Sequence, residues 1–551
     1  MLKHLTIRFS LIFVLLISFD SNIFSQIKVK NGPALTNDED NKMNRMLGGD
    51  ESGYYCYRVR SRGKGTSFYV EKYKNESLKP EFSKEITVDD AEGTKIIDVK
   101  YSNDVVFIFR SQYDKDLDKM ELSYQTVSSS GVVSKDLKPI TKVKTDHFEF
   151  VEFEIETNPS NTKILVKSSF KENKDAEYKT DFIAFSVPEM KELWKKTVNR
   201  KLRSYNSDFG KALLGQLTGI NFDFDQPGYV GLFFDDNDNL FYGYTVENAK
   251  SNDKEKHYKL NLETLDADSD EPESLELSFE EDYYVKDIAF LKTKDNKLYV
   301  GGFYKDVIER KGRDLVNCGI FNFTVDIATN KIESKTVKVF DDKFLKALES
   351  NNKKSRRFKY KLDYILAVGK DIYYIGEQYA EYTVQVGSQY SRHTEWQYEY
   401  MDVIVAKMNS LDEFEWINNA PVRVTMMLRS PHVFKQYISY ATDNNIYILY
   451  NEHPKNMAIY QKPDYEPKDL KSTISIHGSN FVYTSFSIID GKINRGLIFK
   501  NETYCFAPIQ EKNPQFFPPA DTENFVVSGK DEIIIYTEDR GKDRFSKLTL
   551  D

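Results

Sequence analysis

Cysteine, histidine and tryptophan are scarce in this sequence. The small numbers of cysteine and histidine limit the metal sites and disulfides that the chain can form. The 551 residues include three cysteines, seven histidines and three tryptophans. Cys56, Cys318 and Cys505 lie too far apart for a CxxC metal site, and their aromatic or β-branched neighbours are typical of buried thiols. A disulfide between two of them is the alternative. No two histidines have the HxxxH spacing of a zinc site, so we expect no metal and no cofactor.

Long blocks of one charge are also missing. The 77 Lys and Arg residues and the 86 Asp and Glu residues are spread along the chain. Nucleic acid is excluded as a partner because phosphate binding needs a concentrated cationic face. One short basic run, KKSRRFK, begins at residue 353, and its candidate contacts are Lys353, Lys354, Arg356 and Arg357. An anionic glycan, a lipid headgroup or an acidic partner suits this run, with a merely solvated surface as the alternative.

Long apolar runs are absent except near the start, which reads MLKHLTIRFSLIFVLLISFDSNIFSQ. Lys3 and Arg8 precede an apolar run of 11 residues, from Phe9 to Phe19, whereas a membrane-spanning helix needs about 20. The pattern predicts a signal peptide over residues 1–25, cut after Ser25, rather than a transmembrane anchor. We therefore expect residues 26–551 to form an exported, soluble, monomeric protein, periplasmic or extracellular, with no membrane span.

A polar turn followed by an aromatic, β-branched run recurs eight times. The copies are ESGYYCYRV at 51, NDVVFIF at 103, NTKILVK at 161, NDNLFYGY at 237, KDNKLYVGG at 294, KDIYYIGE at 370, DNNIYILY at 443 and KDEIIIYTE at 530. Around the sixth copy four successive strands are predicted, beginning at residues 363, 371, 401 and 413. Repeats of this size and strand content predict an all-β fold, a β-propeller of four-stranded antiparallel blades, with eight blades and seven as the alternative.

The last repeat supplies three strands before the sequence ends at Asp551. A blade that lacks its outer strand leaves a long unpaired edge. The segment QIKVKNGPAL at 26–35 alternates suitably, so we predict that it closes the last blade. Residues 26–551 are then a single propeller domain.

Over nearly all of this length the chain resembles the β-propeller superfamily, in particular secreted bacterial propellers of Gram-negative bacteria that are not WD40 proteins. The resemblance rests on the blade period, since the G-H and W-D marks of WD40 repeats and the Gly-x-Ser-x-Gly turn of propeller-bearing hydrolases are absent. Two similar corners end at Trp194 and Trp416, and for both we expect a packing role.

Some segments interrupt the strand pattern. Residues 207–217 and 341–351 have helical spacing, which predicts two short helices between blades. The DDNDN stretch, Asp235 to Asn239, resembles the start of a calcium loop but lacks its later Gly and Glu, so we expect a hairpin turn. Asp223 and Asp225 have the spacing to serve a cation or a sugar hydroxyl, although a solvated entry loop is the favoured interpretation.

An aromatic insertion, EYTVQVGSQYSRHTEWQYEY at 381–400, separates the second and third strands of the sixth blade. Its candidate contact residues are Tyr382, Tyr390, Arg392, His393, Trp396, Tyr398 and Tyr400. Aromatic rings with polar tips suit recognition surfaces. The alternative is an extended hairpin that packs on its own ring.

In a propeller the loops between second and third strands emerge on the same face as the connections between blades. The insertion, the helices and the basic run are therefore predicted to share one face. Our first hypothesis is a non-catalytic binding or scaffolding protein of the cell envelope that recognises a protein or a glycan through that face. The alternative is a glycan-cleaving or lyase-type enzyme that uses carboxylates in the central funnel, and paired carboxylates there would favour it.

Overall fold

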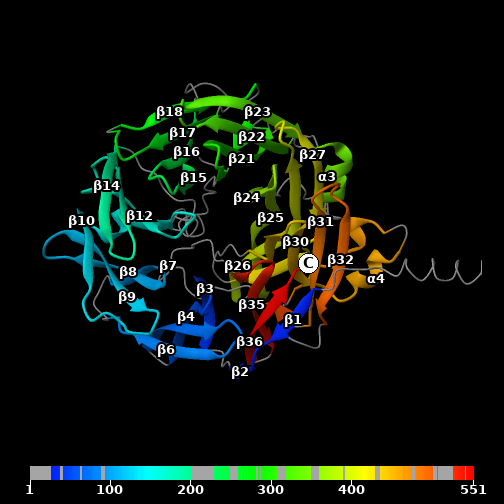
Figure 1. The fold of residues 1–551 in the computed structure, drawn as a ribbon, viewed down its shortest axis with the longest axis horizontal. Coiled ribbons are helices and arrows are strands. Elements are labelled where there is room, and N and C mark those ends of the chain that lie inside the picture. Colours follow the sequence, from blue (N-terminus) through cyan, green and yellow to red (C-terminus); the bar gives the residue numbers. More distant parts are fainter. Residues whose placement is uncertain are drawn as a thin grey trace, which may run out of the picture.

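The computed structural model of the chain describes residues 27–36, 41–62, 65–88, 94–199, 229–247, 258–269, 271–280, 283–285, 287–306, 318–348, 359–388, 391–428, 435–462, 465–474, 478–500, 505–506, 525–539 and 542–550. Eight antiparallel sheets follow one another around a ring (Figure 1). Each sheet is one blade, and its main strands run outward from the ring axis in chain order, except that the outer strand of blade 8 comes from the N-terminal part of the chain. The all-β fold and the blade count of eight are confirmed.

The first four blades are regular four-stranded meanders. Blade 1 contains β3 (Asn41–Gly49), β4 (Gly53–Arg62), β5 (Gly65–Lys74) and β6 (Pro80–Ile86); blade 2 contains β7 (Lys95–Ser102), β8 (Val105–Asp114), β9 (Lys119–Ser128) and β10 (Lys138–Lys144). Blade 3 contains β11 (Val151–Thr157), β12 (Lys163–Phe170), β13 (Lys179–Ser186) and β14 (Lys191–Val198); blade 4 contains β15 (Tyr229–Phe234), β16 (Leu240–Glu247), β17 (Tyr258–Leu265) and β18 (Glu273–Leu277).

The other four blades carry additional elements. Blade 5 contains β19 (Tyr283–Val285), β20 (Ala289–Lys292), β21 (Lys297–Asp306), β22 (Cys318–Asp326) and β23 (Lys331–Val339); blade 6 contains β24 (Lys359–Val368), β25 (Asp371–Ser388), β26 (Ser391–Met408), β27 (Phe414–Ala420) and β28 (Val424–Leu428). Blade 7 contains β29 (Tyr437–Ala441), β30 (Asn445–Glu452), β31 (Asn480–Ser487) and β32 (Ile493–Phe499); blade 8 contains β34 (Phe525–Gly529), β35 (Glu532–Asp539), β36 (Lys542–Thr549) and β1 (Lys28–Asn31), with the short β33 (Cys505–Phe506) and β2 (Leu35–Thr36) alongside.

The position of a strand within its blade explains its sequence pattern. In β30, a second strand, every residue after Asn445 is buried, because blades pack on both of its faces. The outer strand β23 is mostly exposed and rich in Lys and Glu. The polar turns between first and second strands contain residues with positive φ, namely Asn103, Asp104, Asn161, Asp238, Asn296 and Asp531. Asn and Asp tolerate this conformation, which explains the Asp or Asn in the turns of blades 2, 3, 4, 5 and 8.

Apolar side chains form one core cluster at each junction between blades. Eight such clusters join successive blades, the last of them joining blade 8 to blade 1. Trp194 lies in the cluster between blades 3 and 4, and Trp416 packs against the cluster between blades 6 and 7. The packing role predicted for both residues is confirmed. Cys56 and Cys318 are buried free thiols, whereas nothing is described of the Cys505 side chain.

The N-terminal strand closes the ring as predicted. β1 pairs antiparallel with β36, from Lys28 opposite Thr549 to Asn31 opposite Ser546, and Figure 1 shows the blue strand beside the red one. The Gly32 N–H donates to the Phe545 carbonyl at 2.9 Å and continues the pairing. The outer strand of blade 8 thus comes from the opposite end of the chain.

Turns between third and fourth strands dock on the preceding blade. In blade 7, Gly491 has a φ of +69°, and a Cβ at this position would lie 2.7 Å from the Trp416 ring of blade 6. The Asn418 side chain of blade 6 donates to the Gly491 carbonyl at 2.8 Å. In blade 2, Gly131 lies over the Phe82 ring of blade 1 in the same way. Neighbouring blades are therefore connected at the rim as well as through their cores.

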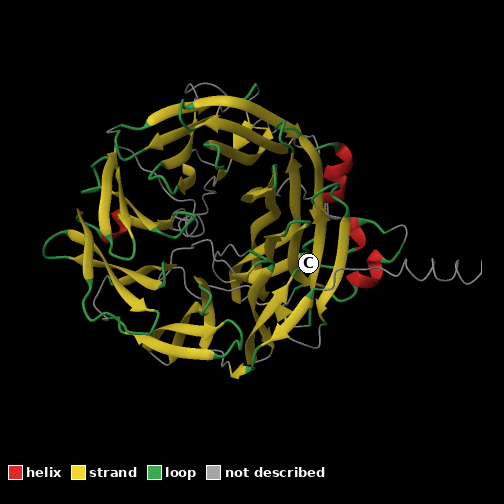
Figure 2. Ribbon diagram, viewed as in Figure 1, coloured by secondary structure: helices red, strands yellow, loops and turns green. Residues whose placement is uncertain are grey.

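Two α-helices lie outside the ring of strands on the side of blades 6 and 7 (Figure 2). Of the two predicted helices, the one at 341–351 is confirmed as α3 (Asp342–Leu348), which buries Leu345 and Leu348. The segment 207–217 lies outside the described residues. The other α-helix seen in Figure 2 is α4 (Asn456–Tyr460), which lies between β30 and β31 and was not predicted. Among the residues described, no helix is long and apolar enough to cross a membrane.

Candidate functional site

Blade 6 extends the propeller plan by lengthening two of its strands. Its second and third strands, β25 and β26, have 18 residues each, whereas the corresponding strands of the other blades have eight to ten. Beyond an irregularity at Glu377 to Tyr379 the two strands stay paired, from Tyr379 opposite Tyr400 to Ser388 opposite Ser391. β28 pairs with the extended part of β26. The predicted insertion is therefore a three-stranded extension of the blade.

One face of this extension is buried in the junction with blade 7. Trp396, Tyr398 and Tyr400 have exposed fractions of 8%, 1% and 1% and belong to the core cluster between blades 6 and 7. Alternate residues of a strand share a face, so all three rings are covered together. The expectation that these three rings form an exposed contact surface is corrected, because blade 7 and β28 cover them.

The opposite face of the extension is polar. The His393 side chain is half exposed, and its Nε2 lies 2.8 Å from Glu395 Oε1. Gln397 Nε2 donates to Glu399 Oε1 at 3.1 Å on the same face. Among the predicted contact residues with described side chains, His393 is therefore the one that solvent reaches.

Several predicted residues carry no side-chain description. Tyr382 and Arg392 lie in β25 and β26, where only their backbone is described. The residues outside the described part are Tyr390, Lys353, Lys354, Arg356, Arg357, Asp223 and Asp225.

The long connection of blade 7, residues 453–479, folds back onto this extension. The Thr473 N–H donates to the Arg423 carbonyl at 2.7 Å, and the Thr425 N–H donates to the Thr473 carbonyl at 2.8 Å. The connection also contains α4, in which Asn456 is buried and bonds to the backbone of residue 471. We call the extension of β25 and β26 (379–400), β28 and the described part of 453–479 the platform.

A second group of polar side chains lies on the inner strands at blade 6. Asp363 occupies a bulge in β24, where the register with β25 shifts between Leu362 and Tyr364. It forms an ion pair with Lys361, 3.1 Å from Nζ to Oδ1, and accepts a hydrogen bond from the Tyr437 hydroxyl of blade 7. A bulge re-aims a side chain, and bulges are frequent beside active sites.

Glu377 completes this inner cluster. It lies on β25 opposite Lys361 and is 3% exposed. Burial, and then the charge of Asp363, raise the pKa of Glu377 to about 8, although Lys361 and Lys435 oppose the shift. Two neighbouring carboxyl groups with different environments are the arrangement that general acid and base chemistry needs.

Sequence reasoning missed this inner cluster. A signal was present, because Lys359, Lys361 and Asp363 alternate in KYKLDY along a first strand. Alternate residues of a strand share one face, which would have predicted a charged inner face on blade 6.

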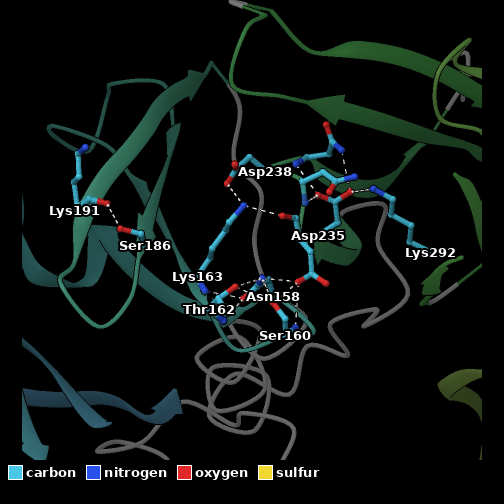
Figure 3. Close-up of polar contacts among 12 residues, drawn as sticks. Asn158, Ser160, Thr162, Lys163, Ser186, Lys191, Asp235, Asp238 and Lys292 are labelled. Atoms are coloured by element: carbon cyan, nitrogen blue, oxygen red, sulfur yellow. Dashed lines mark hydrogen bonds and ion pairs between the residues drawn. The ribbon is translucent and has the colours of Figure 1, made fainter. Parts of the chain in front are cut away.

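The turn from Asp235 to Asn239 is a hairpin turn, as predicted (Figure 3). Asp235 Oδ1 accepts the N–H groups of residues 237 and 239, each at 2.8 Å. Lys292 of blade 5 pairs with Asp235, and Lys163 of blade 3 lies 2.8 Å from Asp238 Oδ1. Amides and lysines therefore occupy carboxylate oxygens that a cation would need, and the contacts connect three blades. Within the described ranges no three His, Cys, Asp or Glu side chains are grouped to hold a metal.

Comparisons with known proteins reveal the fold alone. No family model matches the chain, and no curated protein matches it. Similar solved structures include the WD40 domain of SCAP from fission yeast (TM-score 0.36, 7% identity, 96% of each chain) and the β-propeller domain of the Trilobed protease from Pyrococcus furiosus (TM-score 0.30, 8% identity, 71% of this chain and 93% of that one). Prolyl oligopeptidase B from Galerina marginata is similar at a TM-score of 0.32 and 10% identity, over 82% of this chain and 56% of that one. The structural neighbours are β-propellers, and at these TM-scores they carry no argument about function.

Proposed function

We propose that this chain is an exported, non-catalytic binding or scaffolding propeller that recognises a protein or a glycan of the cell envelope through the platform. The observation that carries the proposal is the platform itself, in which segments from blades 6 and 7 fold together beyond the regular disc. A rigid scaffold that holds irregular segments in fixed relation is the usual design of a recognition surface. Export to the periplasm or the outer surface of a Gram-negative type of envelope rests on the first 25 residues.

The burial of the aromatic rings changes which atoms would make contact. The polar face of the extension offers His393, Glu395 and Gln397, so we expect hydrogen bonding to dominate over ring stacking. The buried rings then hold the polar face in place. This combination suits a glycan hydroxyl surface or a polar protein surface.

The test shortens the hairpin without disturbing its buried face. Residues 385–394 are replaced by Asn-Gly, a two-residue turn that joins Val384 to Glu395, which are paired in the structure. A matched control replaces residues 115–118 of the exposed β8–β9 turn of blade 2 in the same way. Immobilised wild type and both variants are offered envelope extract and a glycan array, with mass spectrometry as the readout. We expect the hairpin variant to retain at least tenfold less of the partner that the wild type and the control capture. Equal capture by all three proteins would contradict the proposal.

An enzyme is the second candidate, because Asp363 and Glu377 are neighbouring carboxyl groups on the inner strands. In this case a protonated Glu377 would donate a proton to a leaving group, and Asp363, paired with Lys361, would be the second carboxyl group of the site. Wild type and the variants Asp363→Asn and Glu377→Gln are incubated with a panel of polysaccharides. Release of reducing ends, or of unsaturated sugars that absorb ultraviolet light, by the wild type but not by either variant would establish this alternative.

A further inference from the structure

Beneath the platform, Arg423 is buried with hydrogen-bonding capacity to spare. It lies between β27 and β28, is 3% exposed, and its Nη2 contacts Asp402 at 3.1 Å from Oδ1 and 3.3 Å from Oδ2. Its Nε and Nη1 have no hydrogen-bond partner among the described residues. A buried guanidinium with unmatched donors is costly, because those N–H groups were hydrogen-bonded to water before folding.

A second guanidinium, that of Arg495, contacts the long connection of blade 7. Arg495, on β32, lies over the Tyr460 ring at 4.5 Å, and its Nη1 donates to the Tyr465 hydroxyl at 3.5 Å. Its Nε has no hydrogen-bond partner within the described ranges. The same connection reaches Arg423, because the Thr473 N–H donates to the Arg423 carbonyl. Asn456 of α4 bonds to the backbone of residue 471 and so holds the Thr473 end of the connection against the helix that carries Tyr460. Residues 453–479 therefore contact both of these partly unpaired guanidinium groups.

Buried oxygen atoms that can accept hydrogen bonds accompany the N–H donors of the two arginines. Thr473 Oγ1 and Glu452 Oε2 are buried and have no hydrogen-bond partner in the described part of the chain, and Asp402 Oδ1 makes the ion-pair contact with Arg423 given above. Thr473 is held against Arg423 by the backbone hydrogen bond described above. We call these five residues the arginine cluster. A group that both donates and accepts would satisfy the cluster, as a sugar hydroxyl does.

The arginine cluster has a net positive charge near neutral pH. Burial raises the pKa of Asp402 to about 6, against the opposing charge of Arg423. Burial likewise raises the pKa of Glu452 to about 7, although a hydrogen bond from Tyr460 opposes the shift. The two carboxyl groups therefore offset the two guanidinium charges only in part near neutral pH, which leaves the cluster able to accept a negative charge.

Basic residues also surround the outer side of this region. Lys455 and Lys471 are exposed near His453. Burial, and then the charges of these two lysines, lower the pKa of His453. These two lysines offer positive charge at the outer side of the cluster, although Glu466 and Asp469 lie in the same connection.

We propose that Arg423 and Arg495 bind the carboxylate of an acidic sugar, such as a uronic acid, in the glycan that the platform recognises. The inference rests on the glycan form of the proposed function. The guanidinium groups pair with the carboxylate, while Thr473 and the two carboxyl groups bond to sugar hydroxyls. The rings of Tyr460 and Tyr465, 5.5 Å apart and nearly perpendicular, lie beside Arg495 and offer apolar surface to the sugar ring.

The test measures binding of single compounds to the mature chain by titration calorimetry. The probes are glucuronate, its neutral counterpart glucose, and a short peptide with a free C-terminal carboxylate. The variants are Arg495→Gln and Arg423→Lys, the second of which keeps the charge but removes Nε and Nη1. Lys530→Gln is the matched control. Lys530, in the β34–β35 turn, pairs with Asp443, in the β29–β30 turn, and its side chain is 75% exposed. Thermal melting checks that each variant is folded.

We expect glucuronate to bind the wild type and Lys530→Gln with equal affinity. It should bind either arginine variant at least tenfold more weakly, and glucose should not bind. Absence of glucuronate binding to the wild type, or undiminished binding to Arg495→Gln, overturns the inference. Binding of the peptide in place of glucuronate also overturns it and identifies a peptide carboxylate as the ligand. The wild type could fail to bind glucuronate while the hairpin variant of the previous experiment still captures less partner than the wild type. In that case this inference is wrong and the proposed function stands.

Discussion

At the scale of the residue, single side chains of the platform divide into those that hold it together and those that meet solvent. Trp396 and His393 are three positions apart on β26 and therefore point to opposite faces. The tryptophan is covered by blade 7, whereas the histidine side chain is half exposed. Substitutions at the two positions should therefore have different consequences.

We predict that Trp396→Ala lowers the free energy of unfolding by about 3–5 kcal/mol, because a buried aromatic side chain is lost and a cavity remains. His393→Ala should change it by about 0.5 kcal/mol or less, since this side chain is half exposed. Denaturant titration followed by fluorescence measures both. A Trp396→Ala variant as stable as the wild type would contradict the burial of this ring.

Glu377 predicts a pH dependence of stability. Its pKa is about 8 in the folded chain, above its ordinary value of 4.5, so the folded state holds the proton more tightly than the unfolded state. Its contribution to stability is therefore complete below pH 4.5 and is lost as the pH rises through 8. Between these values the loss approaches about 1.4 kcal/mol per pH unit. Glu377→Gln should flatten this slope in melting curves recorded from pH 5 to 9, and an unchanged slope would show that Glu377 does not carry it.

At the scale of the element, strands and turns are held by partners from other blades. The turns between third and fourth strands fit against the preceding blade, and β1 is held by β36 from the far end of the chain. These contacts connect elements that have little stability alone, since a pair of strands is marginal in water.

Substitutions at two glycines with positive φ can distinguish the cost of backbone strain in a turn from the cost of disturbing a contact between blades. Gly491 has a φ of +69° and lies against Trp416, whereas Gly369 has a φ of +65° and nothing within 4 Å of a Cβ. We predict that Gly369→Ala costs about 1–2 kcal/mol through backbone strain alone. Gly491→Ala should cost about 1–3 kcal/mol more through the clash with the ring. Equal losses in thermal and denaturant unfolding would show that the turn does not dock as described.

Deletion of residues 27–36 tests ring closure. It removes β1 and β2 and their pairing with β36, about 4–6 hydrogen bonds at about 1 kcal/mol each. This loss is large against the about 5–15 kcal/mol that stabilises a typical domain. We expect a clearly lower melting temperature and a tendency to aggregate through the open edge. The control lacks only residues 1–25, and the prediction is wrong if both proteins melt alike.

At the scale of the whole molecule, eight blades form a ring that is closed by its own first strand. Such a ring has no free sheet edge at the junction between its ends, which removes one cause of association between chains. We therefore expect the mature protein to be a monomer. Our expectation that the protein is exported and soluble depends on removal of the first 25 residues.

We predict that the mature chain begins near Gln26 or Ile27, because the apolar run before it has the length of a signal peptide. Intact-mass measurement of the protein from the envelope fraction checks the cut, and light scattering checks the monomer. An uncut N-terminus in that fraction would contradict export by a cleaved signal peptide. A dimer in solution would contradict the monomer prediction without affecting the fold.

The sequence by itself determined the repeat, the blade count and the closing strand. These features depend on local patterns, namely polar turns, apolar runs and alternation, which adjacent residues express regardless of their distant partners. Even the interpretation of Asp235 to Asn239 as a turn followed from its place in the repeat. The helix at 341–351 was predictable for the same reason, since its apolar spacing is local.

The tertiary structure alone decided which face of each element is covered. Alternation shows that Trp396, Tyr398 and Tyr400 share a face, but blade 7, some 50 residues further along, decides that this face is buried. Arg423 and Arg495 likewise belong to different blades, and both contact the connection 453–479. The raised pKa of Glu377 comes from burial and from neighbours on other strands. Burial and electrostatic coupling depend on contacts between residues far apart in the chain, and a linear pattern does not encode those contacts.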